Sequence, residues 1–173
     1  MLTLVSPAIA AKAPNVLFLM SDDLNTALSG FGHPQCKTPE LDKLAERGMR
    51  FENMHCQYPV CGASRASLMS GLYPYTNGTL GNAGTLRGNM PDVLTMSQLF
   101  RKNGYRVGRV SKIYHMGIPM EIIAGTAKRD DPHSWDEVVN IKAPEQNAPG
   151  EKTNWSPKNK SSQSFTGVVA EGD

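Results

Sequence analysis

The side chains best suited to chemistry in this sequence fall in three short stretches. They are an acidic pair, a cysteine followed closely by an arginine, and a lysine three residues before a histidine: Asp22 and Asp23, Cys61 and Arg65, Lys112 and His115. Adjacent carboxylates repel each other unless a cation or an arginine neutralises them. Their oxygens suit Ca²⁺ or Mg²⁺, although aspartates are equally common in turns and helix caps.

Cys61 is followed only by small residues before Arg65, at the expected start of a helix. A helix N-terminus favours an anion and activates a thiol, and arginine is a two-pronged donor for tetrahedral oxyanions. A Cys56–Cys61 disulfide, or a cysteine that only packs, is the structural alternative. Lys112 could bind an anionic oxygen and His115 could exchange a proton, but a lysine at a strand end is usually a solvated surface charge.

The elements that must position these residues alternate between strands and helices. Hydrophobic runs predict strands and apolar residues at helical spacing predict helices, with Gly48, Gly71 and Gly104 as stops: strands at 15–20, 49–55 and 106–115, and helices at 38–48, 64–71 and 92–104. This alternation indicates an α/β fold with a mostly parallel sheet flanked by helices. Ligands bind outside the carboxyl ends of such strands, which is where the three stretches fall.

Composition narrows the class of protein. The chain has 173 residues, a net charge of +2 and no basic block, which argues against nucleic acid as a partner. No apolar run approaches the roughly 20 residues that span a bilayer. Residues 1–13 are typical of a signal-peptide remnant and predict a periplasmic or secreted protein. Three cysteines are too few for a disulfide scaffold.

Two stretches resemble the type I sulfatases, members of the alkaline-phosphatase-like superfamily. Cys61 to Arg65 fits that family's C-x-[PA]-x-R signature, and "NVLFLMSDD" is similar to its first strand and metal-binding aspartate pair. The match runs from about residue 14 to 117. Within the family, "SKIYHMG" and "DDPHSW" most resemble the iduronate 2-sulfatases.

The resemblance implies that a maturation enzyme oxidises Cys61 to formylglycine. One oxygen of the hydrated aldehyde would attack the sulfur of a sulfated sugar, and the second hydroxyl would then help to expel sulfate. The family's pattern makes Asp22, Asp23 and the residue-61 oxygen ligands of one divalent cation, Ca²⁺ in most members. The same pattern implies that three further residues contact the nucleophile or the sulfate group: Arg65, Lys112 and His115. We also expect Ser64 to cap the helix and so orient the nucleophile.

The sequence departs from the family in length, because sulfatases usually exceed 400 residues and place further ligands later in the chain. We therefore expect 14–127 to be the N-terminal part of a catalytic domain and 128–173 a loop-rich insertion of it, inactive as an isolated fragment. Two other functions remain open at this point. One is a phosphomonoester or phosphonate hydrolase of the same superfamily, and the other is a non-catalytic secreted binding module with a Cys56–Cys61 disulfide.

Overall fold

The computed structural model describes residues 13–117, 120–142, 151–154 and 166–169, and it divides the chain into two compact units. Unit 1 is Met1–Met49 and unit 2 is Arg50–Asp173, and each is described by itself. Residues 1–12, most of the expected signal-peptide remnant, lie outside the described residues. None of the helices in the described part of the chain is long and apolar enough to cross a membrane.

Unit 1 contains the short 3₁₀ helix η1 (Ser29–Phe31) and helix α1 (Pro39–Glu46), as the capping pattern predicts for 38–48. Thr38 precedes α1 but makes no side-chain cap to it. Its hydroxyl instead accepts from the Ser29 amide at 3.1 Å, and the Thr38 amide donates to Ser29 Oγ at 2.9 Å. Ser29 Oγ also donates to Asp42 Oδ2 at 2.6 Å, which ties η1 to α1.

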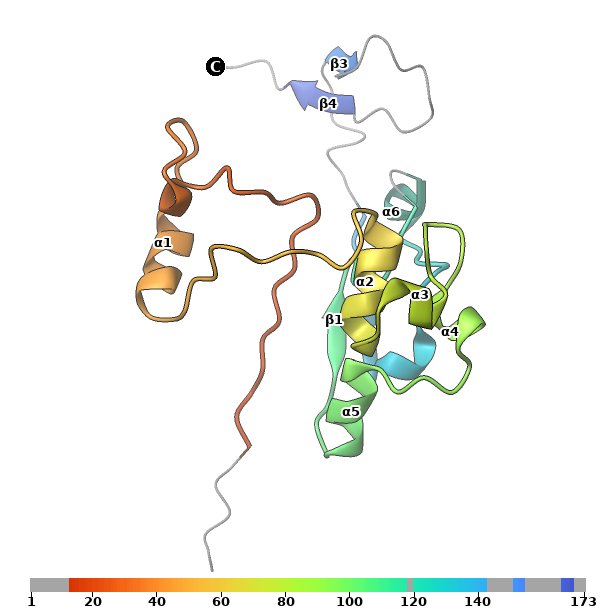
Figure 1. Cartoon of the computed structure of the whole chain (residues 1–173). Helices are drawn as coiled ribbons and strands as arrows, with labels where there is room; N and C mark the ends of the chain where they lie inside the picture. The colour runs from red at the N-terminus through yellow and green to blue at the C-terminus, as the bar shows by residue number, and fades with distance from the viewer. Residues whose placement is uncertain (1–12, 118–119, 143–150, 155–165, 170–173) are drawn as a thin grey trace, which may run out of the picture. The chain divides into compact units, whose positions relative to one another are not determined.

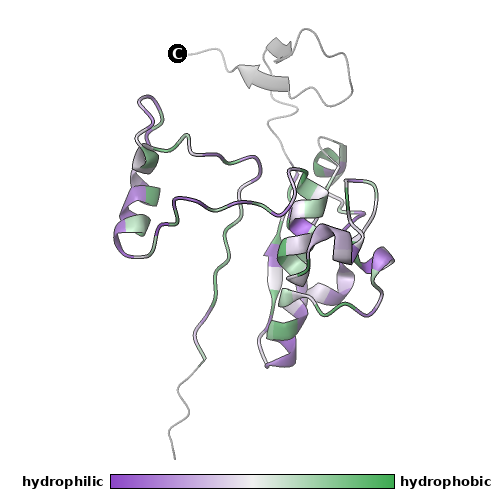
Figure 2. Cartoon of the chain, in the orientation of Figure 1, coloured by the Kyte–Doolittle hydropathy of each residue, from purple (hydrophilic) through white to green (hydrophobic). Residues whose placement is uncertain are grey.

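The expected strand at 15–20 is absent from the described part of unit 1. Figure 2 shows this run as a hydrophobic stretch of extended chain, and its side chains are exposed, Leu17 by 82%. A buried strand needs neighbouring strands for its hydrogen bonds. The described residues of unit 1 contain only helices, so the run has no strand beside it within that unit. The expected strand at 49–55 is also not formed.

Unit 2 holds the remaining elements (Figure 1). In chain order its helices are α2 (Cys61–Ser70), α3 (Pro74–Asn77), α4 (Leu86–Asn89), α5 (Met96–Lys102), α6 (Met120–Ala124) and the 3₁₀ helix η2 (Pro132–Ser134). Its strands are β1 (Gly108–Val110), β2 (Glu137–Val139), β3 (Glu151–Asn154) and β4 (Thr166–Val169). Helix α2 contacts α3 and α5, and α5 contacts η2.

Strands β1 and β2 pair in parallel, with Arg109 opposite Val138. The connection between them carries α6 and η2, so the unit contains the β-α-β crossover of an α/β fold. Strands β3 and β4 form a separate antiparallel pair. The predicted α/β class with a parallel sheet is confirmed. The strands and helices after residue 117 were not predicted, because the polar 128–173 segment shows no sustained periodicity.

The core of unit 2 lies between α2, α4 and the segments around β1 and η2. It is made by apolar side chains that are nearly inaccessible to solvent: Ala66, Met69, Leu86, Val93, Tyr114 and Trp135. The rings of Tyr114 and Trp135 meet edge to face, with centroids 6.1 Å apart. Helix α2 ends at Gly71, whose φ of 69° is left-handed, as a C-terminal glycine stop requires.

A buried network of hydrogen bonds links α4, α5 and η2 beside this core. Asp131 receives Arg87 Nη2 at 2.8 Å and Ser134 Oγ at 2.8 Å. Ser134 Oγ in turn lies 2.9 Å from Thr95 Oγ1 and 3.1 Å from the Tyr114 hydroxyl. Every member of the network has a partner, which is the condition under which buried polar groups do not destabilise a core.

A second polar cluster lies at β1. Arg109, 2% exposed at its side chain, forms an ion pair with Asp130 and donates to Asn140 Oδ1 at 2.9 Å. Asp130 also accepts from Trp135 Nε1 at 3.0 Å. The adjacent aspartates of "DDPHSW" therefore form ion pairs with two different arginines. The two ion pairs connect the η2 segment to the rest of unit 2.

Candidate active site

Cys61 is the first residue of α2, and its half-buried side chain lies between two polar groups. Its Sγ is 3.3 Å from Asn82 Oδ1 and 3.3 Å from His115 Nδ1. The helix begins three residues earlier than the range 64–71 that the sequence suggested. The sulfur thus has polar neighbours and partial access to solvent, which differs from the dry packing site that a purely structural cysteine prefers.

A backbone N–H group at the N-terminus of α2 is hydrogen-bonded by a residue from outside the helix. The residue before it, Val60, makes no side-chain cap, and the Gly62 amide donates to Asn82 Oδ1 at 2.8 Å. The expectation that Ser64 caps the helix is wrong, because Ser64 lies inside it and its amide bonds to the Val60 carbonyl at 2.9 Å. Asn82 was missed because it lies in a turn-rich loop that carries no local capping signal.

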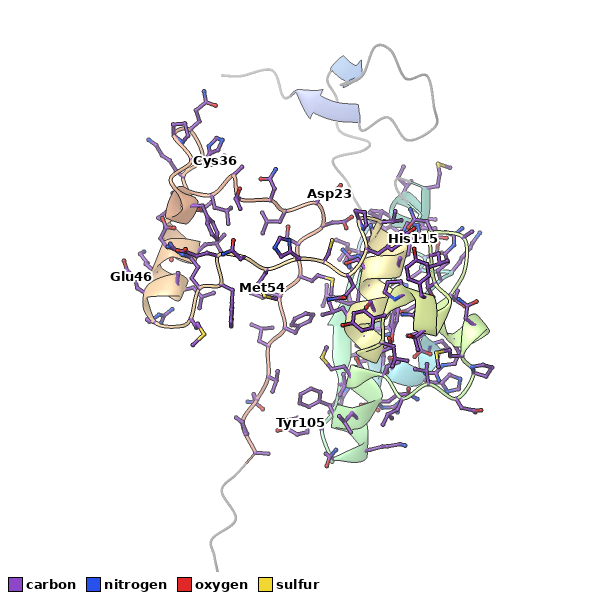
Figure 3. The ribbon with its side chains drawn as sticks, in the orientation of Figure 1. Asp23, Cys36, Glu46, Met54, Tyr105 and His115 are labelled. Carbon is purple, nitrogen blue, oxygen red and sulfur yellow. The ribbon has the colours of Figure 1, made fainter. Side chains whose placement is uncertain are left out.

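Arg65 joins α2 to the segment that carries Lys112 and His115. The arginine is only 5% exposed, and its Nη1 donates to the Lys112 carbonyl at 3.0 Å and to the Ile113 carbonyl at 2.9 Å. The Arg65 guanidinium therefore fixes the backbone on which these two side chains stand. Figure 3 labels His115 beside α2, in agreement with its contact to Cys61.

The segment 111–117 leaves the carboxyl end of β1, as expected for a ligand-binding loop of a parallel sheet. Ser111 turns the chain with a left-handed φ of 61°. Tyr114 anchors the middle of the loop in the core through its hydroxyl contact to Ser134. Burial raises the pKa of Tyr114 to about 12, with the hydrogen bond to Ser134 opposing that rise, so the phenol stays neutral and keeps its hydrogen bond.

Asp22 and Asp23 lie in unit 1, directly after the hydrophobic run 15–20. Both residues are exposed, and Asp23 has a left-handed φ of 53°. Two carboxylates offer oxygen ligands of the kind that Ca²⁺ prefers, but Ca²⁺ takes about six to eight of them. Among the described residues, no group of three or more His, Cys, Asp or Glu side chains is arranged to hold a metal ion. Within the described residues the pair therefore supplies two carboxylate groups, which is fewer ligands than Ca²⁺ takes.

Unit 2 gathers four of the predicted site residues around the start of α2: Cys61, Arg65, Lys112 and His115. The structural alternative of a Cys56–Cys61 disulfide is wrong, since Cys36, Cys56 and Cys61 are all free thiols. A sulfur flanked by an amide oxygen and an imidazole is a setting for a reactive group whose protons are held and exchanged.

Comparison with known proteins finds similarity over most of the chain. A model of the family described as "Sulfatase" matches residues 14–167. The chain is 36% identical to arylsulfatase A of Bos taurus over 69% of its length, and 32% identical to iduronate 2-sulfatase of Homo sapiens over 71%. It is 31% identical to N-acetylglucosamine-6-O-sulfatase of Bacteroides thetaiotaomicron over 75%.

These alignments cover 24%, 22% and 24% of the respective relatives, so the chain spans about a quarter of the length of the curated proteins it matches. A solved structure described as the crystal structure of Ps i-CgsB superposes with a TM-score of 0.54. It is 32% identical, and the superposition covers 68% of this chain and 25% of that one. Similarity in sequence and in fold therefore points to one family.

Proposed function

The chain belongs to the sulfatase family, and on that premise we propose that the protein carrying it hydrolyses sulfate esters of a sulfated sugar. Residue 61 is the nucleophile after oxidation of its cysteine to formylglycine, and the site would take one divalent cation, Ca²⁺. The observation that supports this best is the position of Cys61, at the start of α2 and within 3.3 Å of His115 Nδ1.

The environment of residue 61 fits an oxygen-bearing group. The Cys61 sulfur is half-buried, unpaired, and faces an amide oxygen and an imidazole. Oxidation of its CH₂–SH to an aldehyde breaks the C–S bond, forms a C=O bond and releases the sulfur as sulfide. The two electrons that this step gives up pass to dioxygen, which the maturation enzyme uses as the oxidant. The hydrated aldehyde supplies an oxygen nucleophile that can later release sulfate when the carbonyl re-forms.

The neighbouring residues bind, orient and exchange protons. Arg65 holds the backbone at Lys112 and Ile113 through their carbonyls. The Lys112 ammonium can then attract the sulfate group, and the His115 ring lies beside residue 61. His115 is suited to take or return a proton at the oxygen bonded to that residue. Asp22 and Asp23 would supply carboxylate ligands to such a cation, and the chemistry that the cation would supply is stabilisation of negative charge on an oxygen nucleophile.

A sulfated sugar is the preferred substrate class because two of the relatives carry sugar sulfates in their names: N-acetylglucosamine-6-O-sulfatase and iduronate 2-sulfatase. An iduronate 2-sulfate is our specific proposal, from the "SKIYHMG" and "DDPHSW" stretches. The apolar residues at the start of the chain support a periplasmic or secreted location, where extracellular glycans are met.

The test uses the whole protein that carries this sequence, co-expressed with a formylglycine-generating enzyme. We expect the peptide containing Cys61 to show the mass of the aldehyde, and the protein to release inorganic sulfate from an iduronate 2-sulfate disaccharide in a Ca²⁺-dependent way. Cys61→Ser should abolish release, whereas the matched variant Cys56→Ser, at an exposed thiol, should retain it. Full activity of Cys61→Ser, or cleavage of phosphate esters in place of sulfate esters, would contradict the proposal.

A further inference from the structure

We propose that Asn82 is a positioning residue for the nucleophile, a role that the signature residues do not include. The inference rests on the proposed function, since it treats residue 61 as the reacting group. Asn82 lies in the loop between α3 and α4, 21 positions along the chain from Cys61. Its amide oxygen contacts both the backbone and the side chain at the start of α2.

The identity of the contacting atom follows from its partners. The Gly62 amide is a donor at 2.8 Å, so the side-chain atom of Asn82 that faces it must be the oxygen. The same oxygen lies 3.3 Å from Cys61 Sγ. A helix cap requires only the first of these contacts. The second places a fixed acceptor against the atom that is chemically transformed.

Gly62 makes this double contact possible. A Cβ built at position 62 would collide with the carbonyl oxygen of Gly81 and lie 2.8 Å from Asn82 Oδ1. Backbone and a short amide side chain cannot move aside as the end of a long flexible side chain could. The absence of a side chain at position 62 therefore lets the Gly81–Asn82 segment close over the first turn of α2.

The consequence concerns the direction of one O–H bond. An oxygen that replaces the sulfur on the same Cβ lies within reach of Asn82 Oδ1 on one side and His115 Nδ1 on the other. Asn82 Oδ1 can only accept, so it fixes a hydroxyl proton toward itself and leaves the oxygen lone pairs free for other partners. The His115 ring can both donate and accept. Asn82 thus orients the group, while proton exchange is assigned to His115.

The first experiment uses this chain with Cys61 unmodified, as verified by the mass of the protein. It does not depend on catalysis. Amide hydrogen exchange at Gly62 is measured in Asn82→Ala, Asn82→Asp and Asn89→Ala. Asn89 is the matched control because it is exposed, lies nearby, and donates to Thr79 Oγ1 at 3.1 Å. We expect exchange at Gly62 to rise about tenfold in Asn82→Ala. Asn82→Asp keeps an acceptor and should stay within about twofold, as should Asn89→Ala.

The second experiment uses the whole protein in its aldehyde form and separates kcat from KM. Loss of nucleophile orientation should lower kcat by about 10- to 100-fold in Asn82→Ala while KM changes less than about twofold. Gly62→Ala keeps the C-x-[PA]-x-R signature and should reproduce this loss by displacing the same loop. Asn82→Asp should recover part of the rate, and Asn89→Ala all of it.

The two proposals fail in different ways. If the wild-type protein releases no sulfate, the proposed function is wrong, and Gly62 exchange still decides whether Asn82 holds the start of α2. If the wild type is active and Asn82→Ala matches Asn89→Ala in kcat, the positioning role is wrong and the sulfatase assignment stands. Unchanged exchange at Gly62 in Asn82→Ala would also overturn the inference. A rise in KM with kcat unchanged would do the same, because it would make Asn82 a substrate contact.

Discussion

The most informative test of the scaffold is the substitution Asp131→Asn. The Asp131 side chain is 3% exposed and that of its partner Arg87 is 18% exposed, so the pair is largely shielded from water. Burial opposes ionisation of Asp131, but the hydrogen bonds from Arg87 and Ser134 outweigh it and hold the pKa of this carboxyl below its ordinary value.

The expected loss follows from the contacts of the two carboxylate oxygens. Oδ2 accepts from Arg87 Nη2 and Ser134 Oγ, and Oδ1 accepts from Arg87 Nε at 3.2 Å and the His133 amide at 3.3 Å. An asparagine replaces one of these acceptors by a donor, whichever way its amide turns. At least one hydrogen bond from Arg87 is lost and a largely shielded guanidinium loses its charged partner, so the free energy of unfolding should fall by about 3 kcal/mol.

The pH dependence of the same variant gives the sign of the effect. A carboxyl whose pKa is lowered in the folded state stabilises it above the unfolded pKa of about 4, and this contribution is lost as the pH falls through the folded value. The difference in stability between wild type and Asp131→Asn should therefore be full at pH 7 and shrink in acid.

Denaturant titration of this chain at several pH values measures the difference in the free energy of unfolding. The control is Asp92→Asn, at an exposed carboxylate near the same network, where we expect a change within about 0.5 kcal/mol. A loss below about 1 kcal/mol at pH 7, or a gap that widens in acid, would refute the reasoning. Because Ser134 also holds the Tyr114 hydroxyl, Asp131→Asn should in addition loosen the loop that carries His115.

Two further predictions concern the same unit. Burial raises the pKa of Tyr114 to about 12, so ultraviolet titration should show a tyrosine step near that pH, and Tyr114→Phe should remove it. Because the unfolded chain loses this proton near pH 10, unit 2 should lose stability as the pH rises from about 10 toward 12. Gly71→Ala places a side chain at a left-handed φ of 69° and should lower the free energy of unfolding by about 1 kcal/mol in a thermal melt; an unchanged melting temperature would contradict this.

The helices could be predicted because their signals are local. A proline at the first position, apolar residues at helical spacing and Gly48 as the stop are enough to predict α1. Helix α5 was predicted too long, at 92–104, because its true start is set by the capping box between Thr95 and Gln98. Helix α2 was predicted too short, because its first turn holds only small residues and is satisfied by the distant Asn82.

The strands and the site could be predicted only in part. Strand β1 was predicted too long, at 106–115, because the chain leaves the sheet after Val110. The short strand β2 falls in a polar segment and is defined only by its parallel pairing with β1. The run 15–20 has the right composition for a buried strand but no strand partner among the described residues of unit 1. Spacing selected Lys112 and His115 as candidates, but it could not reveal that Arg65 donates to the Lys112 carbonyl or that Asn82 faces the sulfur.

Ser111 and Asp23 have one property in common among the described residues: they are the non-glycine positions with left-handed backbone. One directly precedes Lys112 and the other belongs to the acidic pair. Such conformations have a local energetic cost that the surroundings must outweigh, and they gather where geometry matters more than stability. Substituting glycine at both positions would remove that energetic cost and is an obvious way to raise thermal stability. Each substitution would raise thermal stability and make the backbone next to Lys112, or at the acidic pair, more flexible. Substitutions meant to stabilise this protein should therefore start at other positions.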